Sequence, residues 1–516
     1  MLLNRRTFLA GSALAAASMG LGLAGCGSEN GAAGSNGAKE ISAAVAYEAK
    51  TYLPANNSSA LALGANWHVI EGLYELNLVD FKPYKALAAD DPVKISDTEY
   101  EVSLREGAKF SDGTDVTPED VVASFKRTMA PEGALYKSMV DFIDDIVKKD
   151  GTTVTVKLKY PFSLVKERLT LIKIVPEKAT DDDLAKMPIG SGPWKYKEIN
   201  EKTVTFEPNE NYNGEKPATS ETMRWDIIKD ATARTTAITE GTVIVMENVP
   251  ADTADQVRSA GADVESVQGF NLPFFMFNTK KKPFDDNRVR QAFFWAIDIE
   301  KLIENAMAGM AAPVTSFLPE NHKNYHKASV VYTYDTEKAK SLLKEAGQEG
   351  LKLTLQTTDH SWIKALSAQI KNDLEAAGMS VEINEQASAA LYANQADVDN
   401  PTYDVALAPG DPSVFGNDPD LLMNWWYGDN IWTQKRTQWK DSKGYKKLHK
   451  EMEKAIASEG EEQQTAWNNC FDILSEEVPL YPLFHRQVAT GVYGDKIDGF
   501  QPIGTTGLLF LGATAK

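Results

Sequence analysis

Short stretches that alternate apolar and polar residues recur along the chain, between longer stretches with the periodicity of amphipathic helices. Alternation with period 2 is typical of a half-buried strand, and apolar residues three and four apart are typical of a helix. Because the two patterns interleave, the sequence predicts an α/β fold. No internal repeat is visible. We expect strands at 100–104, 152–159, 203–207, 272–278 and 351–357, and helices at 286–307, 336–346, 363–377 and 445–458.

The start of one further helix can be placed to the residue. Thr117 is followed by Pro118 and, two positions later, by Asp120. Threonine is a favourable N-cap, and proline fits the first helical position. Val121 and Phe125 then begin an apolar stripe, so we expect a helix that begins at Pro118.

Length and charge narrow the class of protein. The chain has 516 residues, enough for roughly two to four domains with cores of their own. A content of 43% hydrophobic and 25% charged residues excludes a disordered or collagen-like chain. The formal net charge of −19 would repel phosphate backbones, so we expect no nucleic-acid partner.

The N-terminal residues have the features of an export signal. Arg5 and Arg6 precede a modestly apolar stretch at 9–24, which is shorter than the ~20 residues that span a bilayer and fits a signal peptide. It ends in Leu23-Ala-Gly-Cys26, which looks like the cleavage box of a lipoprotein. We therefore expect a twin-arginine-like signal peptide at 1–25 and a lipid on Cys26.

Two alternatives remain open for this region. One is a buried N-terminal helix with an incidental cysteine. The other concerns the export route, because Asn4 and Ala10 depart from the residues usual around a twin arginine and leave Sec export open. Residues 26–39 are rich in Gly, Ser and Asn and predict a flexible tether between lipid and globular body.

Motifs of common enzymes are missing from the sequence. There is no H-E-x-x-H, no G-x-S-x-G and no Gly-Lys pair for a P-loop, and the one G-x-G-x-x-G lies inside the predicted signal peptide. His322 and His326 have i, i+4 spacing, but their polar surroundings favour a solvated loop over a metal site. We therefore expect a binding protein with no catalytic residues, no metal ligands and no cofactor.

Six sequence blocks, in order, resemble a known family. They are Glu71-Gly-Leu-Tyr-Glu75, Leu104-Arg-Glu-Gly-Ala-Lys-Phe-Ser-Asp-Gly-Thr114, Thr117-Pro-Glu-Asp-Val-Val122, Ile189-Gly-Ser-Gly-Pro-Trp194, Arg288-Val-Arg-Gln-Ala292 with Ala296-Ile-Asp298, and Tyr334-Asp335 with Leu342-Leu343. The chain resembles the family 5 solute-binding proteins of ABC importers, which include dipeptide, oligopeptide and nickel binders.

The resemblance implies a periplasmic-binding-protein-like fold of two α/β lobes joined by a hinge, with an extra subdomain in the N-terminal lobe. It places lobe 1 and its subdomain at 40–270, lobe 2 at 271–482, and a C-terminal return to lobe 1 at 483–516.

The resemblance also suggests ligand-binding residues. Relatives that bind peptides use an aspartate after a strand to pair with the α-ammonium group, and the strand at 404–408 places Asp411 at that position. Asp418 and Asp420 remain alternatives, because the usual aromatic residue before the loop is replaced by Ala408-Pro409. Further candidates are Trp425 and Trp426, for stacking or for packing, with Tyr47, His360 and Trp362.

The function implied is that of an extracytoplasmic, membrane-anchored lipoprotein that captures short peptides by lobe closure. Its partners would be a cognate permease and ATPase complex, and we expect a monomer. Two alternatives use the same fold: a binder of oligosaccharide or nickel chelate, and a surface enzyme or chaperone. Peptide length, side-chain preference and the presence of an outer membrane do not follow from the sequence.

Overall fold

The computed structural model describes residues 39–55, 57, 59–130 and 136–516, and residues Lys39–Lys516 form one compact unit. The predicted signal peptide, Cys26 and all of the predicted tether except Lys39 lie outside the described residues. No helix in the described ranges is long and apolar enough to cross a membrane.

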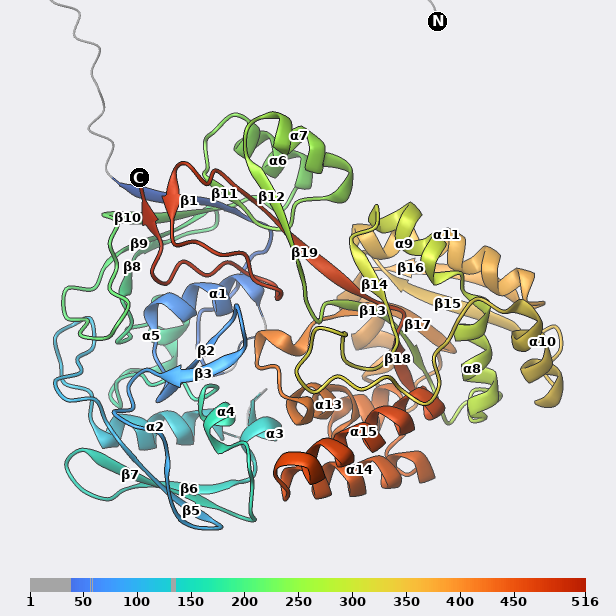
Figure 1. Ribbon diagram of the computed structural model, residues 1–516, viewed down its shortest axis with the longest axis horizontal. Coiled ribbons are helices and arrows are strands. Elements are labelled where there is room, and N and C mark those ends of the chain that lie inside the picture. Colours follow the sequence, from blue (N-terminus) through green and yellow to red (C-terminus); the bar gives the residue numbers. More distant parts are fainter. Residues whose placement is uncertain (1–38, 56, 58, 131–135) are drawn as a thin grey trace, which may run out of the picture. The chain divides into compact units, whose positions relative to one another are not determined.

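The first lobe is built on an eight-stranded mixed sheet (Figure 1). Its central strand β1 (Glu40–Val45) pairs in parallel with β10 and β11 and is almost wholly buried, as its apolar sequence requires. The order is β12 (Asp263–Gln268), β19 (Phe484–Val492), β11 (Val245–Met246), β1, β10 (Thr222–Ile227), β9 (Thr203–Pro208) and β8 (Trp194–Ile199), and β14 (Ala311–Pro313) also pairs with β19.

Helices and short hairpins complete this lobe. Two clusters of buried apolar side chains form the core of this lobe. One includes Leu61 and Trp225, and the other includes Ile238 and Val257. The elements are α1 (Ala60–Val69), α5 (Asp181–Lys186), α6 (Ala231–Thr239) and α7 (Ala254–Ser259), with the hairpins β2 (Tyr74–Asn77)–β3 (Lys82–Lys85) and β20 (Ile497–Asp498)–β21 (Thr514–Ala515).

A four-stranded antiparallel sheet forms the extra subdomain of this lobe. Its helix α2 (Pro118–Thr128) begins where the sequence predicts, because Thr117 and Asp120 form a capping box at its first turn. The other elements are β4 (Val93–Ser96), β5 (Glu99–Ser103), β7 (Thr153–Leu158) and β6 (Ile143–Lys148), in that order, with α3 (Lys137–Val140) and α4 (Val165–Leu169).

The second lobe contains a five-stranded mixed sheet covered by helices (Figure 1). Strand β13 (Leu272–Phe277) is inside this sheet, and all its residues are buried, which explains its uninterrupted apolar sequence. The order is β16 (Ser380–Gln386), β15 (Lys352–Thr358), β17 (Val405–Gly410), β13 and β18 (Leu480–Pro482). The helices are α8 (Asn287–Ala296), α9 (Ile299–Met307), α10 (Thr336–Glu345), α11 (Ser361–Ala376), α12 (Ser388–Leu391), α13 (Pro419–Tyr427), α14 (Lys443–Ile456) and α15 (Gly460–Glu477).

One predicted helix is wrong in its extent. The single helix expected at 286–307 is two helices, α8 and α9. Ile297 has an extended backbone (φ −90°, ψ 128°), and the Asp298 side chain accepts a hydrogen bond from the Lys301 amide to cap α9. An aspartate inside a periodic stretch can cap a new helix, and here it does. The other predicted strands and helices match the structure to within a few residues.

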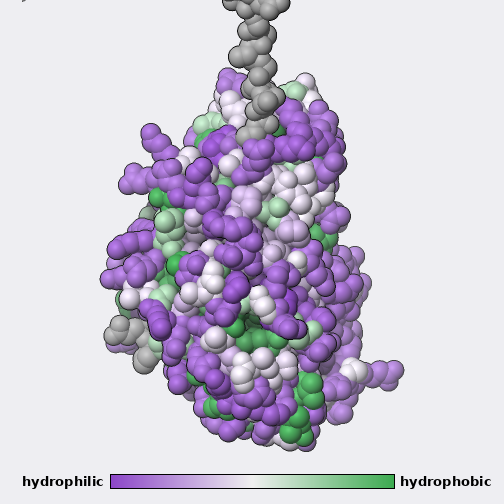
Figure 2. All heavy atoms as spheres, turned by 90° about the vertical axis from the view of Figure 1, so that its left-hand side faces the viewer, coloured by the Kyte–Doolittle hydropathy of each residue, from purple (hydrophilic) through white to green (hydrophobic). Residues whose placement is uncertain are grey.

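The chain passes between the lobes twice. It leaves the first sheet after Gln268 and enters the second at Leu272, and it leaves the second at Pro482 and returns in β19. Between these crossings, β14 of the second-lobe segment pairs with the Phe484–Arg486 end of β19. β19 lies between β12 and β11, so a segment near the C-terminus completes the first sheet. The face of the molecule in Figure 2 is mainly hydrophilic with small apolar patches, which fits the 25% of charged residues in the sequence.

Candidate ligand-binding site

A loop of the second lobe reaches the C-terminal segment of the first. Asp411 follows β17 directly and caps the short turn at Pro412–Val414, where its Oδ1 accepts from the Ser413 amide at 3.1 Å. Its Oδ2 accepts from the Thr506 amide at 3.2 Å and the Thr506 hydroxyl at 3.1 Å. The Thr505 hydroxyl donates to the same oxygen at 3.3 Å. Burial raises the pKa of Asp411, and these hydrogen bonds oppose the shift.

Two ionisable residues of the first lobe lie near this loop. Tyr47 comes two residues after β1, and Glu247 comes directly after β11. The Ala46 amide donates to Glu247 Oε2 at 2.8 Å, whereas Oε1 has no partner among the described residues. Burial raises the pKa of Glu247. Burial also raises the pKa of Tyr47 to about 12, with smaller effects of Glu247, Arg486 and Asp411, so these groups share one electrostatic environment.

Arg486 of β19 lies at the crossing between the lobes. Its Nη2 donates to Asn248 Oδ1 of the first lobe at 2.9 Å. Its guanidinium carbon is 5.1 Å from the ring centroid of Trp362, which belongs to α11 of the second lobe. Asn248 adopts a left-handed backbone (φ 54°), which directs the turn after β11 toward this position. Tyr47, Trp362 and Asp411 were predicted for the site, and the structure brings them around Arg486.

The other predicted site residues lie elsewhere. His360 is exposed at the start of α11, where its Nδ1 is 3.1 Å from Thr358 Oγ1. Trp426 is fully buried and packs on Phe270 and Phe274. The prediction that Trp426 contacts a ligand is therefore corrected to a packing role. The helical spacing of α13 turns it into the core.

Trp425, the neighbour of Trp426, points to a different place. It is partly buried, with its ring centroid 5.2 Å from that of Phe415. It lines a cavity of about 660 Å³ whose other walls include Phe142 and Tyr160 of the extra subdomain and Trp432.

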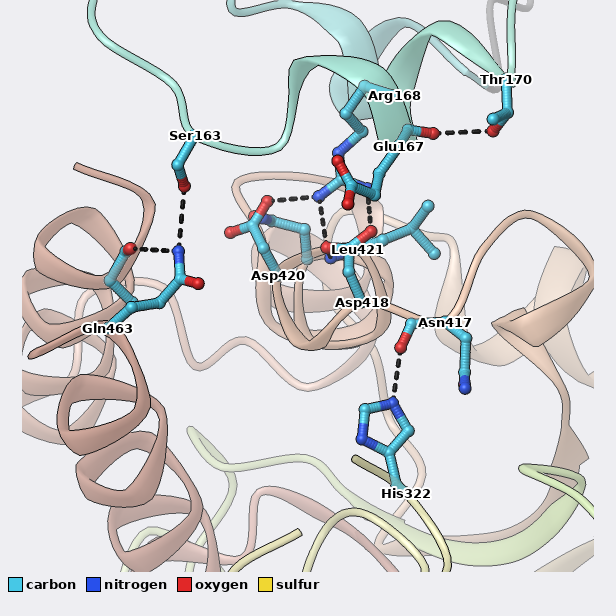
Figure 3. Close-up of polar contacts among 12 residues, drawn as sticks. Ser163, Glu167, Arg168, Thr170, His322, Asn417, Asp418, Asp420, Leu421 and Gln463 are labelled. Atoms are coloured by element: carbon cyan, nitrogen blue, oxygen red, sulfur yellow. Dashed lines mark hydrogen bonds and ion pairs between the residues drawn. The ribbon is translucent and has the colours of Figure 1, made fainter. Parts of the chain in front are cut away.

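The two alternative aspartates are held in an ion pair. Asp418 and Asp420 both accept from Arg168 of α4, at 2.6–3.1 Å (Figure 3). All three side chains are at most 8% exposed. Arg168 belongs to the extra subdomain of the first lobe, and the two aspartates belong to the second lobe. This triad therefore joins the two lobes. Of the three candidate aspartates, Asp411 is the one beside Tyr47 and Arg486.

The solvated loop expected for the histidine pair is wrong for His322, which is buried, whereas His326 is partly exposed. His322 Nε2 lies 2.6 Å from the Asn417 carbonyl (Figure 3), and its Nδ1 accepts from the Asn324 amide. His326 Nε2 lies 3.6 Å from Asp472. No group of three or more His, Cys, Asp or Glu side chains that could hold a metal ion occurs in the part of the chain that the structure describes.

Sequence reasoning missed Arg486, Glu247 and the threonines at 505 and 506. A signal existed for Arg486, because it is the one Lys, Arg, Asp or Glu in the largely apolar stretch at 478–493. No comparable signal marked Glu247, which is one of many acids in the sequence.

Comparison with known proteins agrees with this architecture. Residues 82–434 match the family model described as bacterial extracellular solute-binding proteins, family 5 Middle. The chain belongs to this family. It is therefore a substrate-binding protein of the ABC-importer type, and proteins of this family act outside the cytoplasm.

Named relatives bind different small solutes. The glutathione-binding protein GsiB of Salmonella typhi is 24% identical over 494 residues, which cover 93% of this chain and 95% of GsiB. The "Probable D,D-dipeptide-binding periplasmic protein DdpA" of Escherichia coli is 25% identical over 347 residues, covering 64% of this chain and 65% of that protein. These relatives are named as binding proteins and not as enzymes.

A solved structure shows the same fold. The dipeptide-binding protein of Pseudoalteromonas sp. SM9913, in complex with Met-Leu, has a TM-score of 0.79 at 18% identity, covering 93% of this chain and all of that one. The expected two-lobed α/β fold is confirmed.

Proposed function

We propose that this protein captures short peptides between its lobes and delivers them to the permease and ATPase complex of an ABC importer. The observation that carries the proposal is the position of Asp411. A loop of the second lobe holds this carboxylate beside Tyr47 and Arg486 at the crossing between the lobes. The site therefore offers both signs of charge, which suits a ligand with an ammonium and a carboxylate group.

Capture would proceed by closure of the lobes. The Asp411 loop contacts Thr505 and Thr506 of the first lobe, so these hydrogen bonds belong to the closed arrangement. The triad of Arg168, Asp418 and Asp420 is a second contact between the halves. A ligand that contacts both lobes shifts a hinge equilibrium toward the closed state, and this state is what a permease would recognise.

We propose the location from the N-terminal sequence and the assembly from the site. The predicted signal peptide and Cys26 would export the chain and attach it to the membrane by a lipid, with residues 26–39 as a tether. We expect the protein to work as a monomer, because the closed site is made from lobes of one chain.

The experiment is mass spectrometry under native conditions on protein purified without refolding. Peptide masses that leave the protein on unfolding support the proposal, whereas a ladder of hexose masses or a nickel chelate contradicts it. A second measurement is small-angle scattering with and without a mixture of dipeptides. The radius of gyration should fall with the peptides, and identical profiles at saturating peptide would exclude closure.

A further inference from the structure

The arginines of the described chain differ in whether a carboxylate balances the charge of the guanidinium group. Apart from Arg234 and Arg486, each forms an ion pair with a carboxylate within 4.0 Å. Arg234 donates to the backbone carbonyls of Ile228, Lys229 and Asn248. The guanidinium of Arg486 has a single hydrogen bond to another described residue, the one from its Nη2 to Asn248 Oδ1. A guanidinium has five N–H donors, so most of those of Arg486 are available to a ligand.

The position of Arg486 is fixed although its charge is not neutralised. Its amide donates to the Asn271 carbonyl at 2.7 Å, and the next residue, Gln487, donates to the Met310 carbonyl at 3.1 Å. The side chain lies between Asn248 of one lobe and the Trp362 ring of the other. Stacking on an aromatic ring orients the plane of a guanidinium and leaves its edge free for a planar anion.

A second charged group nearby is also only partly hydrogen-bonded. Glu247 is 3% exposed, and its Oε1 has no hydrogen bond within the described ranges, although the Ala46 and Gly507 amides both act on the carboxylate and oppose the rise of its pKa. It is adjacent to Asn248, the residue that holds Arg486. Buried polar groups are nearly always hydrogen-bonded, so an N–H group of a ligand would find a free acceptor at Glu247 Oε1.

Asp411 is a poor partner for Arg486 in the free protein. Its two oxygens accept from Ser413, Thr505 and Thr506, and no ion pair between Asp411 and Arg486 occurs among the described residues. Although the protein is rich in acidic residues, none of their carboxylates in the described part of the chain pairs with Arg486. Its guanidinium is therefore free to bind the carboxylate of a ligand.

We propose that Arg486 is a specificity-determining residue that binds the carboxylate of the ligand, so that this protein selects small compounds with a free carboxylate. The inference rests on the proposed function and deepens it. A carboxylate matches the guanidinium edge in a bidentate arrangement, which an amide or ester does not reproduce. Glu247 Oε1 would accept from an N–H group of the same ligand.

The test compares three compound panels by thermal shift and calorimetry. The first is an equimolar mixture of dipeptides with free C-termini, the second is the same mixture as C-terminal amides, and the third contains free amino acids and small hydroxy acids. We expect the first mixture to raise the melting temperature of the wild type and the amides to have little effect. Arg486→Gln should weaken binding of the free acids by about 10- to 100-fold, the range of a charge-assisted hydrogen bond.

Two variants keep the test decisive. Arg486→Lys keeps the positive charge but cannot form two parallel hydrogen bonds to a carboxylate. This variant should therefore bind free acids more weakly than the wild type and still prefer them over amides. Arg258→Gln removes an exposed arginine that pairs with Asp255 and should bind like the wild type. If Arg486→Gln does not fold, the Lys variant carries the comparison.

The outcomes separate the two proposals. Equal binding of acids and amides by the wild type, or unchanged binding by Arg486→Gln, overturns the role of Arg486 and leaves peptide capture standing. Binding of the third panel but of no peptide, lost in Arg486→Gln, overturns peptide capture and upholds Arg486. If no panel raises the melting temperature, both proposals are overturned.

Discussion

Arg168 and Asp418 form a two-pronged ion pair across the boundary between the lobes. Nη1 donates to Oδ2 at 3.1 Å and Nη2 to Oδ1 at 3.0 Å, and Nη2 also donates to Asp420 at 2.6 Å. The cation therefore lies between two buried carboxylates that would repel each other without it.

Replacing Arg168 should destabilise the protein strongly. Arg168→Met keeps most of the side-chain volume but leaves Asp418 and Asp420 buried without a cation. Breaking a buried ion pair in this way costs about 3–5 kcal/mol, measured as a lower free energy of unfolding in denaturant at pH 7. Arg258→Met, at an exposed pair, should change it by less than about 1 kcal/mol. Equal effects of the two variants would show that the triad does not hold the halves together.

The carboxyl group of Asp420 should give the triad a pH dependence. Burial raises the pKa of Asp420 from its ordinary 3.8 to about 6. The folded state therefore binds more protons than the unfolded state between these values, and the contribution of Asp420 to the free energy of unfolding falls as pH rises from about 4 to about 6. In Asp420→Asn this decline disappears, so wild type minus variant should decrease over that range. A constant difference would contradict the raised pKa.

Three buried histidines should act in the opposite direction. Burial lowers the pKa values of His68, His322 and His485 from 6.5 to about 4. The unfolded state therefore takes up more protons below pH 6.5, and the free energy of unfolding should fall as pH drops from 6.5 to 4.

His68 offers the clearest single test of this loss. Its Nδ1 is 2.8 Å from the Gly64 carbonyl, and its Nε2 accepts from the Phe510 amide at 2.8 Å, which fixes the C-terminal segment. His68→Gln should be less stable at pH 7 and should show a smaller further loss on acidification. An unchanged acid slope would mean that His68 is not held neutral.

Asp411→Asn should weaken the binding of free-amine peptides by about tenfold or more, because it removes the charge that meets an ammonium group. The structure adds a second effect, since an amide nitrogen would face the donors of Ser413 and Thr506. The melting temperature of the free protein should therefore also fall. Calorimetry with free and N-acetylated dipeptides measures the first effect, and Asp285→Asn, at an exposed position, is the control. Unchanged binding would move the anchor to another residue.

Cys26→Ser should move the protein from the membrane fraction to the soluble or secreted fraction, because the predicted lipid attaches there. Fractionation with a carbonate wash measures this. A variant that stays with the membrane would contradict lipid attachment at Cys26.

Local patterns in the sequence predicted helices and strands well where interactions between residues close in sequence determine their ends. Thr117 and Pro118 located the start of α2 because a cap and a fixed φ act within one turn. The periodic apolar residues at 286–307 did not show the break at Ile297, because the aspartate that caps α9 also fits the surface of a continuous helix.

The site was predicted only in part, for a physical reason. Tyr47, Trp362 and Asp411 followed from the resemblance. Glu247 and Arg486 are recognised in the structure because these charged groups have no ion-pair partner of opposite charge among the described residues. An unpaired buried charge depends on every neighbour, and the neighbours come from distant parts of the chain: β11, β19 and α11. Trp426 shows the converse, because aromatic clustering in sequence does not distinguish a core position from a binding one.

The place of β19 in the first sheet also bears on how the protein is made. Synthesis delivers β1 early and β19 near the end, yet β19 separates β11 from β12 in the finished sheet. Until β19 emerges from the ribosome, β12 has no strand to pair with, and the first lobe stays incomplete. During that interval the pairing edges of β11 and β12 are exposed, and unpaired strand edges promote aggregation.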